Sequence, residues 1–268
     1  MLVLDLNNSL STDGIKKEKD YQDKKNEIIN ALSTLGFFYA QNHGIEEKEI
    51  KQLFKIAKQF FNEKEEIKNK YPFTGNEGYS RLGQERLSKK YQLDYKEAFN
   101  LPSNFKQLEH PLPEIFENDK AFLDTFTKKC NQTCQTILRE IALSLDLDKD
   151  YFIKAHQYED KSGSIMRILH YPPLSKDIDR NTITRAGSHS DYGTLTLLFQ
   201  EDSEIGEENS GLQVLKDQNS DEWLDVPYKK GSIIVNVADL LSIWTEGRLR
   251  SAKHRVVLPE NSKLDTNR

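Results

Sequence analysis

The stretch Gly187-Ser188-His189-Ser190-Asp191-Tyr192-Gly193-Thr194-Leu195-Thr196-Leu197-Leu198 passes from small polar residues into an aliphatic run. This pattern is typical of a strand that carries side chains into a site before the chain returns to the core. His189 and Asp191 are two residues apart, and residues i and i+2 of an extended chain lie on the same face. One imidazole and one carboxylate are therefore expected side by side, which suits two ligands of one metal ion.

A third ligand is available in His254, which opens the apolar run His254-Arg255-Val256-Val257-Leu258. The chain has only 6 histidines, so this partner strengthens the prediction. Two imidazoles and one carboxylate on one face of an octahedral ion leave three positions open, as in non-haem Fe(II) oxygenases. Two other interpretations remain at this point: a surface pair without metal, and a zinc hydrolase site with the same donors.

Composition limits the partners and the compartment. The 268 residues can form one large domain or two small ones, and the net charge of -5 comes without a basic block. The charge argues against nucleic acid and acidic membranes as partners. No apolar run reaches membrane-spanning length, the amino terminus lacks a signal-peptide pattern, and two cysteines cannot form a disulfide framework. A reducing, cytoplasmic location is therefore expected.

Helical patterns fill the first half of the chain and strand patterns the second. Helices are predicted over about 21–35, 46–70 and 119–145, with a buried strand over 37–40, whereas 79–99 looks irregular. After Ser164, short apolar runs are separated by loops rich in glycine, proline and small polar residues. The order predicts an α+β protein built around an antiparallel sandwich or barrel.

Several short motifs in this order resemble one family, the Fe(II)- and 2-oxoglutarate-dependent dioxygenases, in the branch that contains isopenicillin N synthase. The motifs are Gly36-Phe37-Phe38, Asn42-His43-Gly44-Ile45, Phe60-Phe61, Gly78-Tyr79, Asp94-Tyr95-Lys96-Glu97, Tyr171-Pro172-Pro173, His189-x-Asp191, Asn236-x-x-Asp239 and His254-Arg255-Val256. The resemblance covers nearly the whole chain. Each motif is weak alone, but their common order is specific.

The resemblance implies a double-stranded β-helix (jelly roll) core with amino-terminal and supporting helices. It implies an N-terminal region over 1–110, supporting helices over 111–160 and a core over 161–268, all in one structural unit. Iron would be bound by His189, Asp191 and His254, with 2-oxoglutarate and O2 as cosubstrates and ascorbate as a candidate reductant. The expected reaction hydroxylates or desaturates a small organic molecule while 2-oxoglutarate becomes succinate and CO2. The alternatives are an Fe(II) oxidase of the same fold without 2-oxoglutarate, and a non-catalytic metal-binding jelly roll.

Binding of 2-oxoglutarate is assigned by the same resemblance to Tyr171 and to an arginine after the second histidine. Arg268 lies 14 residues beyond His254, about where that arginine falls in the family, but it is the last residue and the family's following serine is missing. The expectation is that the chain is truncated there, or that it ends there naturally and binds 2-oxoglutarate weakly. Arg167, four residues before Tyr171, has the right parity to be the anchor instead, but no other feature supports it.

The substrate is the part that the sequence determines least. Tyr79, Arg81, Phe99, Phe199 and Trp244 fall in segments that line the substrate side in relatives. Arg81 is a candidate partner for a substrate carboxylate, with a solvated loop arginine as the alternative. Asn236 and Asp239 are expected to hold the loop after their strand, and His170 to pack or lie at the surface. The protein is expected to act as a monomer or weak oligomer.

Overall fold

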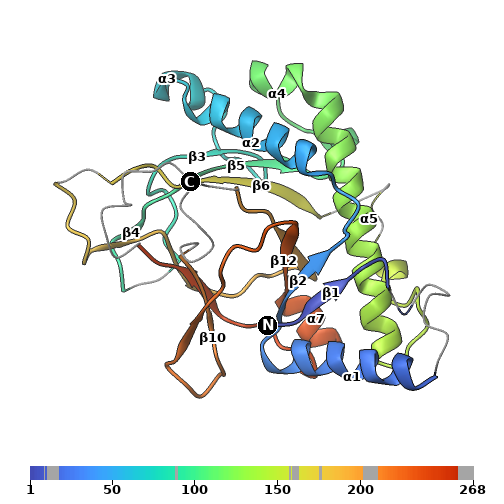
Figure 1. Ribbon diagram of the computed structural model, residues 1–268. Coiled ribbons are helices and arrows are strands. Elements are labelled where there is room, and N and C mark those ends of the chain that lie inside the picture. The colour runs from blue at the N-terminus through green and yellow to red at the C-terminus, as the bar shows by residue number, and fades with distance from the viewer. Residues whose placement is uncertain are drawn as a thin grey trace.

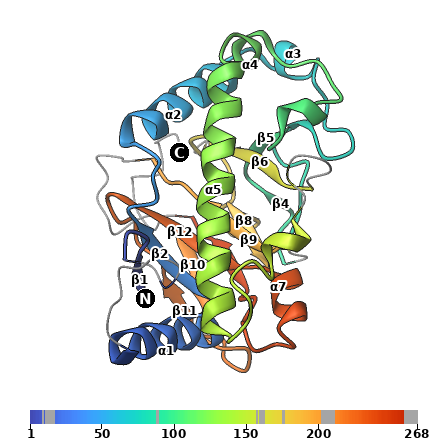
Figure 2. The same cartoon turned by 90° about the vertical axis from the view of Figure 1, so that its right-hand side faces the viewer.

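The computed structural model describes residues 1–8, 10, 18–87, 90–156, 158, 163–174, 177–201 and 211–258. Its helices are α1 (Glu18–Thr34), α2 (Glu47–Phe61), α3 (Glu65–Lys68), α4 (Glu114–Asn118), α5 (Lys120–Ser144) and α7 (Asp239–Trp244). The longest, α5, runs along the whole height of the molecule and contacts both the upper and the lower helices (Figures 1 and 2).

The strands form two four-stranded sheets and two smaller ones. The first sheet has the order β1 (Val3–Asp5), β2 (Phe37–Gln41), β12 (Ser232–Val237), β9 (Leu195–Leu198). The second has the order β11 (Trp223–Asp225), β10 (Leu212–Leu215), β13 (His254–Val256), β8 (Ala186–His189). A three-stranded sheet joins β3 (Gly78–Ser80), β5 (Glu97–Pro102) and β6 (Ile165–His170), and β4 (Leu93–Asp94) pairs with β7 (Ile183–Thr184).

The first sheet combines strands from both ends of the chain. β2 pairs with β12 over five residues, from Ser232↔Gln41 to Asn236↔Phe37. Both faces of β2 are buried, because Phe38 and Ala40 face α1 and α5 while Phe37 and Tyr39 face the second sheet. The amino-terminal segment is therefore part of the core, and a further apolar cluster packs α2, α4 and α5 against the three-stranded sheet.

The predicted helices over 21–35 and 119–145 are confirmed as α1 and α5, but two expectations are wrong. The helix over 46–70 breaks after Phe61, because Lys64 is extended and α3 begins afresh at Glu65. The segment 79–99, predicted to be irregular, contains β3, β4 and the start of β5. Every residue of β5 is buried, so this central strand has no polar alternation to reveal it.

A sharp turn joins α1 to β2 at Gly36. Its φ is +71°, a conformation that glycine adopts without steric cost, and its amide bonds to the carbonyl of Ala31. A Cβ there would lie 2.1 Å from the carbonyl oxygen of Arg250. Gly36 thus allows the segment before His254 to pass close to the end of α1. None of the described helices has the length and hydropathy to cross a membrane.

Candidate metal centre

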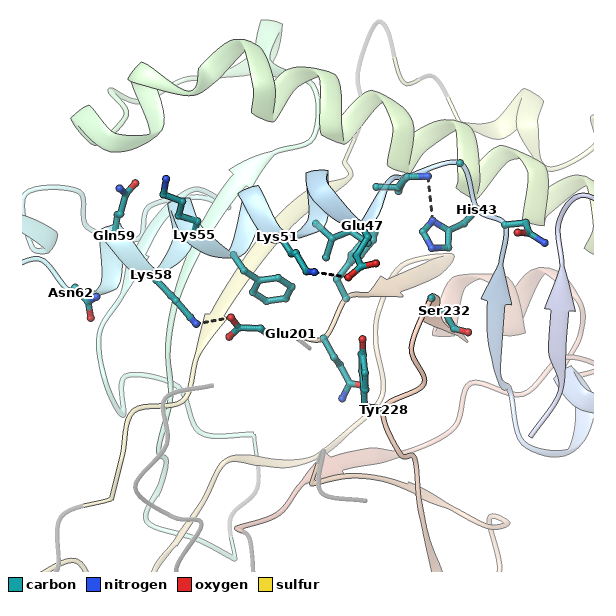
Figure 3. Close-up of a pocket in the computed structure, with 18 residues that line it drawn as sticks. His43, Glu47, Lys51, Lys55, Lys58, Gln59, Asn62, Glu201, Tyr228 and Ser232 are labelled. Carbon is teal, nitrogen blue, oxygen red and sulfur yellow. Dashed lines mark hydrogen bonds and ion pairs between the residues drawn. The ribbon is translucent and has the colours of Figure 1, made fainter. Parts of the chain in front are cut away.

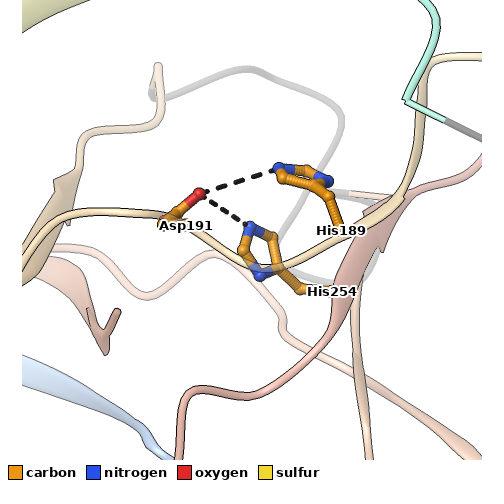
Figure 4. Close-up of side chains that lie close together, drawn as sticks. All are labelled: His189, Asp191 and His254. Atoms are coloured by element: carbon orange, nitrogen blue, oxygen red, sulfur yellow. Dashed lines mark ion pairs between the residues drawn. The ribbon is translucent and has the colours of Figure 1, made fainter. Parts of the chain in front are cut away.

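Two neighbouring strands of the second sheet bring the predicted ligands together. His189 ends β8 and His254 begins β13, and the two residues are directly opposite in the antiparallel register. Asp191 lies two residues past the end of β8, in the turn, rather than on the strand as predicted. Its Oδ1 atom is 3.7 Å from Nε2 of His189 and 3.6 Å from Nε2 of His254 (Figure 4). One potential ligand atom from each residue lies within 4.8 Å of the others.

Both imidazoles are oriented by backbone carbonyls. Nδ1 of His189 bonds to the carbonyl of Gly187 at 2.8 Å, and Nδ1 of His254 bonds to that of Ala252 at 3.2 Å. A carbonyl only accepts, so each Nδ1 carries the proton and each Nε2 lone pair is directed toward Asp191. Burial lowers the pKa of His189 to about 4, which keeps this ring neutral at pH 7. Neutral imidazole is the form that binds a metal.

The second carboxylate oxygen of Asp191 is held by a cross-strand pair. Oδ2 accepts a hydrogen bond of 2.6 Å from the Thr196 hydroxyl and one of 2.9 Å from the Asn236 amide. Thr196 and Asn236 are opposite each other in β9 and β12. Burial alone would raise the pKa of Asp191, but His254 and these two hydrogen bonds lower it. Asp191 is thus fixed as a carboxylate that presents one oxygen to the imidazoles.

The turn around Asp191 is also held by its backbone. The amide of Asp239, the first residue of α7, donates to the carbonyl of Asp191 at 2.8 Å. The Asp239 carboxylate accepts a hydrogen bond from Ser190. Asn236 and Asp239 were expected to hold the loop after their own strand; the contacts instead hold the loop between β8 and β9, which carries Asp191.

Tyr171 lies immediately after β6, and its ring is near Arg185, whose guanidinium carbon is 5.9 Å from the ring centroid. Burial raises the pKa of the Tyr171 phenol to about 12, so the hydroxyl keeps its proton at pH 7 and can act as a donor. The prediction for Arg268 falls outside the described residues.

The five predicted substrate residues are not brought together. Tyr79 and Phe99 face each other across β3 and β5 in the apolar core, with the Tyr79 hydroxyl bonded to Glu97. Arg81 is exposed on the loop after β3. Trp244 ends α7, where its ring stacks on Phe152 at 6.2 Å between centroids. These placements leave the substrate roles as predictions.

Phe199 lines a cavity of about 720 Å³ between α2 and the ends of β2, β9 and β12 (Figure 3). This end of β12 begins at Ser232, four residues from Asn236, so it is about 13 Å along the strand from the Asp191 clamp. Lys51, Lys55 and Lys58 line the cavity from one face of α2. None of the three candidate metal ligands lines it.

Sequence reasoning missed a buried polar group next to the metal centre. The Asp94 carboxylate, fully buried, accepts hydrogen bonds from the amides of Gly187 and Leu87, both at 3.1 Å. Gly187 in turn accepts the proton of His189. The motif Asp94-Tyr95-Lys96-Glu97 could have drawn attention to Asp94, but nothing in the sequence showed that Asp94 would hydrogen-bond to β8.

Comparison with known proteins agrees with this geometry. A model of the 2OG-Fe(II) oxygenase superfamily matches residues 162–265, and a model of the amino-terminal region of non-haem dioxygenases in morphine synthesis matches residues 3–123. A proline hydroxylase, buaE, from Petromyces alliaceus is 37% identical over 87% of this chain and 74% of its own. A 2-oxoglutarate-dependent dioxygenase, htyE, from Aspergillus rugulosus is 32% identical over 98% and 82%.

Solved structures give the same result. A full-length Neurospora crassa protein, crystallised in complex with alpha-KG, superposes with a TM-score of 0.81 and 28% identity over 99% of this chain and 81% of its own. Its resemblance extends over the amino-terminal helices as well as the sheets that carry the three candidate ligands. The chain therefore belongs to the 2OG-Fe(II) oxygenase superfamily, and it is an Fe(II)- and 2-oxoglutarate-dependent dioxygenase.

Proposed function

We propose that His189, Asp191 and His254 bind the catalytic iron of this dioxygenase. The observation that carries the proposal is the convergence of two imidazole nitrogens and one carboxylate oxygen from three separate positions in the chain. The donors fit Fe(II), because two neutral imidazoles and one carboxylate form the three-ligand set of non-haem iron oxygenases. The carboxylate also offsets part of the charge of the cation.

Iron bound there supplies coupled oxidation by O2, in which 2-oxoglutarate becomes succinate and CO2 while the substrate is oxidised. The protein's own part is orientation. The carbonyls of Gly187 and Ala252 fix the two rings, and Thr196 with Asn236 directs one oxygen of Asp191 toward them. Three protein ligands leave positions for the cosubstrate and oxygen.

For 2-oxoglutarate we propose Tyr171 as a hydrogen-bond donor and Arg268 as the cation for the far carboxylate. A guanidinium can form two parallel charge-assisted hydrogen bonds with a carboxylate. The support for Tyr171 is its place in the motif Tyr171-Pro172-Pro173 and beside Arg185, immediately after β6. Arg268→Ala is expected to weaken 2-oxoglutarate binding without changing iron affinity.

The fold supports a finer assignment. We propose that the two four-stranded sheets, which enclose the cluster of Phe37, Tyr39 and Ile234, are the two halves of a double-stranded β-helix. We also propose that the regions 1–110, 111–160 and 161–268 form one structural unit. The support is that β1 and β2 hydrogen-bond in one sheet with β12, and that α1 packs on α5.

The substrate is proposed to be a small organic molecule, which is hydroxylated or desaturated. The Neurospora crassa protein has also been solved with alpha-KG and thymine, and JOX2 with 2OG, Fe and JA, at TM-scores of 0.82 and 0.74. The bound molecules differ between the two relatives, so the relatives support a small organic molecule as the substrate class but not its identity.

The test adds Fe(II) and 2-oxoglutarate without oxygen and follows the weak visible charge-transfer band, then measures succinate after oxygen is admitted. Replacing His189, Asp191 or His254 by alanine should each abolish iron binding and succinate formation, and Asp191→Glu should fail too because its oxygen is displaced by one methylene. His110→Ala, a change at an exposed histidine, is the matched control. Full metal-dependent turnover in any triad variant with a native circular dichroism spectrum would remove that residue from the site.

A further inference from the structure

One face of the sheet β3-β5-β6 packs under the helices, and the other, called here the polar face, carries Arg167. Ile168 belongs to the apolar cluster under the helices, and His170 stacks on Phe61 from α2, at 5.0 Å between ring centroids. Side chains alternate along a strand, so Arg167, with Leu169 and Tyr171, lies on the opposite face. The side chain of Arg167 is 30% exposed, so this part of β6 borders solvent-accessible space.

Two cations on this face bind one carboxylate. Nη2 of Arg167 lies 2.5 and 2.6 Å from the two carboxylate oxygens of Glu85, and Nζ of Lys96 lies 3.3 Å from Oε2 of the same group. The side chains of Arg167 and Glu85 are 30% and 26% exposed, whereas that of Lys96 is 6% exposed. The carboxylate is thus held at the rim of a buried cationic site.

The cluster lies next to the metal centre. Nζ of Lys96 is 3.9 Å from Oδ2 of Asp94, whose other oxygen bonds to the amide of Gly187, two residues before His189. A small molecule bound through an anionic group on Arg167 would therefore have the rest of its body near the candidate iron ligands.

A further cation, Arg185, lies beside Tyr171, and its guanidinium donates to the carbonyls of Pro172 and Tyr95. Cations gathered in one place favour the binding of an anion.

Glu85 is the removable member of this cluster. It lies in the loop between β3 and β4, whereas Arg167 lies within β6 and Lys96 immediately before β5. If a substrate carboxylate replaces that of Glu85, Arg167 and Lys96 remain paired with an anion. The exchange therefore avoids the free-energy cost of leaving a buried charge without a partner. A ligand without an anionic group would have to leave Glu85 in place.

We propose that Arg167 and Lys96 form the subsite for a carboxylate of the substrate, and that Glu85 occupies this subsite until the substrate displaces it. The inference rests on the proposed function, because it places the substrate next to the iron ligands. It assigns the carboxylate-binding role that the sequence suggested for Arg81 to Arg167, and it predicts that the substrate is a carboxylic acid. The competing explanation is a static ion pair that only ties the loop to the sheet.

The test compares small acids with their primary amides, which have nearly the same shape but lack the carboxylate charge. The probes are L-proline and L-prolinamide, phenylacetate and phenylacetamide, and indole-3-acetate and indole-3-acetamide. Binding to the Fe(II)–2-oxoglutarate protein is measured by anaerobic calorimetry for the wild type, Glu85→Gln, Arg167→Gln and Arg167→Lys. Arg139→Gln, which removes a different arginine–carboxylate ion pair, the one with Asp150, is the control. Thermal unfolding of each variant establishes that it is folded.

Loss of the internal competitor should make Glu85→Gln bind at least one acid roughly tenfold more tightly than the wild type does, because the competent fraction rises. The amides and the Arg139→Gln protein should show no such change. Arg167→Gln should remove the preference for acid over amide, and Arg167→Lys should restore part of it.

The proposal is overturned if Glu85→Gln binds acids and amides equally or binds no acid, because the site would then show no preference for an anionic group. It is also overturned if Arg167→Gln abolishes the 2-oxoglutarate charge-transfer band, because Arg167 would then be the cosubstrate anchor. Failure of the proposed function has a different signature, namely a wild-type protein in which Fe(II) and 2-oxoglutarate give no band at all.

Discussion

Removing the two hydrogen bonds to Oδ2 of Asp191 should weaken metal binding without unfolding the protein. Thr196→Val replaces a hydroxyl by a methyl group of similar size, and Asn236→Ala removes the amide. A hydrogen bond to a charged group contributes about 1.5–3 kcal/mol. The Asp191 side chain is 25% exposed, so water can replace part of each bond, and the lower end of that range is expected.

Each single variant should therefore lose about tenfold in metal affinity, within the 10–100-fold range typical of residues that orient metal ligands. The double variant should lose less than about 100-fold, because both bonds are made to the same oxygen and their effects are coupled. The physical cause is the freedom of Asp191 to rotate, which turns Oδ1 away from the two imidazoles.

The measurement is a titration with Mn(II), which is stable in air, followed by electron paramagnetic resonance. Thr194→Val is the matched control, because its hydroxyl bonds to His156 rather than to a candidate ligand. Unchanged Mn(II) affinity in the double variant would refute the idea that this pair orients Asp191. An equal loss in Thr194→Val would show that the effect arises from general disturbance of the turn.

Three further changes test other parts of the molecule. Glu97→Gln removes the buried anionic partner of Lys68 and leaves only the exposed carboxylate of Glu65, 3.2 Å from its Nζ atom, so it should cost about 3 kcal/mol of unfolding free energy in urea. Burial raises the pKa of Glu97, but hydrogen bonds from His170, Lys68 and Tyr79 lower it overall. The stabilisation by ionised Glu97 is therefore complete above its ordinary pKa of 4.5 and is lost as the pH falls below that value. A variant that unfolds in acid as the wild type does would contradict this. Gly36→Ala should cost about 2–4 kcal/mol from its positive φ and the contact with a carbonyl, whereas Gly75→Ala, with open space at its Cβ, should cost only about 1. Tyr171→Phe should weaken 2-oxoglutarate binding several-fold at constant Mn(II) affinity; equal loss of both would indicate a packing role instead.

The long amphipathic helices were predictable because their apolar spacing is a local signal. α1 and α5 agree with the predicted ranges within about three residues. The break at Asn62 was not predictable in this way, because the apolar stripe continues through Phe60 and Phe61 into Ile67. Strand β5 was missed because it lies between β3 and β6 and is buried on both faces. Its sequence therefore lacks the alternation of polar and apolar residues that predicts a strand.

The candidate metal ligands were predictable from local spacing and family order together. Their supporting contacts were not, because each depends on a strand pairing between distant segments. Asn236 reaches Asp191 only through the β9–β12 register, and Asp94 reaches Gly187 across 93 residues. Residue types in the sequence give no indication of which strands will be neighbours.

The reassignment from Arg81 to Arg167 shows what the structure adds to a chemical argument. From the sequence, Arg81 was a candidate partner for a substrate carboxylate with a solvated loop arginine as the alternative, and Arg167 was considered only as an anchor for 2-oxoglutarate. Arg81 is exposed there, where an ion pair contributes little. Arg167 lies on the polar face of a sheet, beside buried Lys96, and already binds a carboxylate. Its guanidinium therefore interacts more strongly with an anion than the exposed guanidinium of Arg81 does. If the acid-and-amide comparison supports Glu85 as the displaced group, the loop that carries it controls entry to the site through one side chain, and substitutions at position 85 should change which acids this dioxygenase accepts.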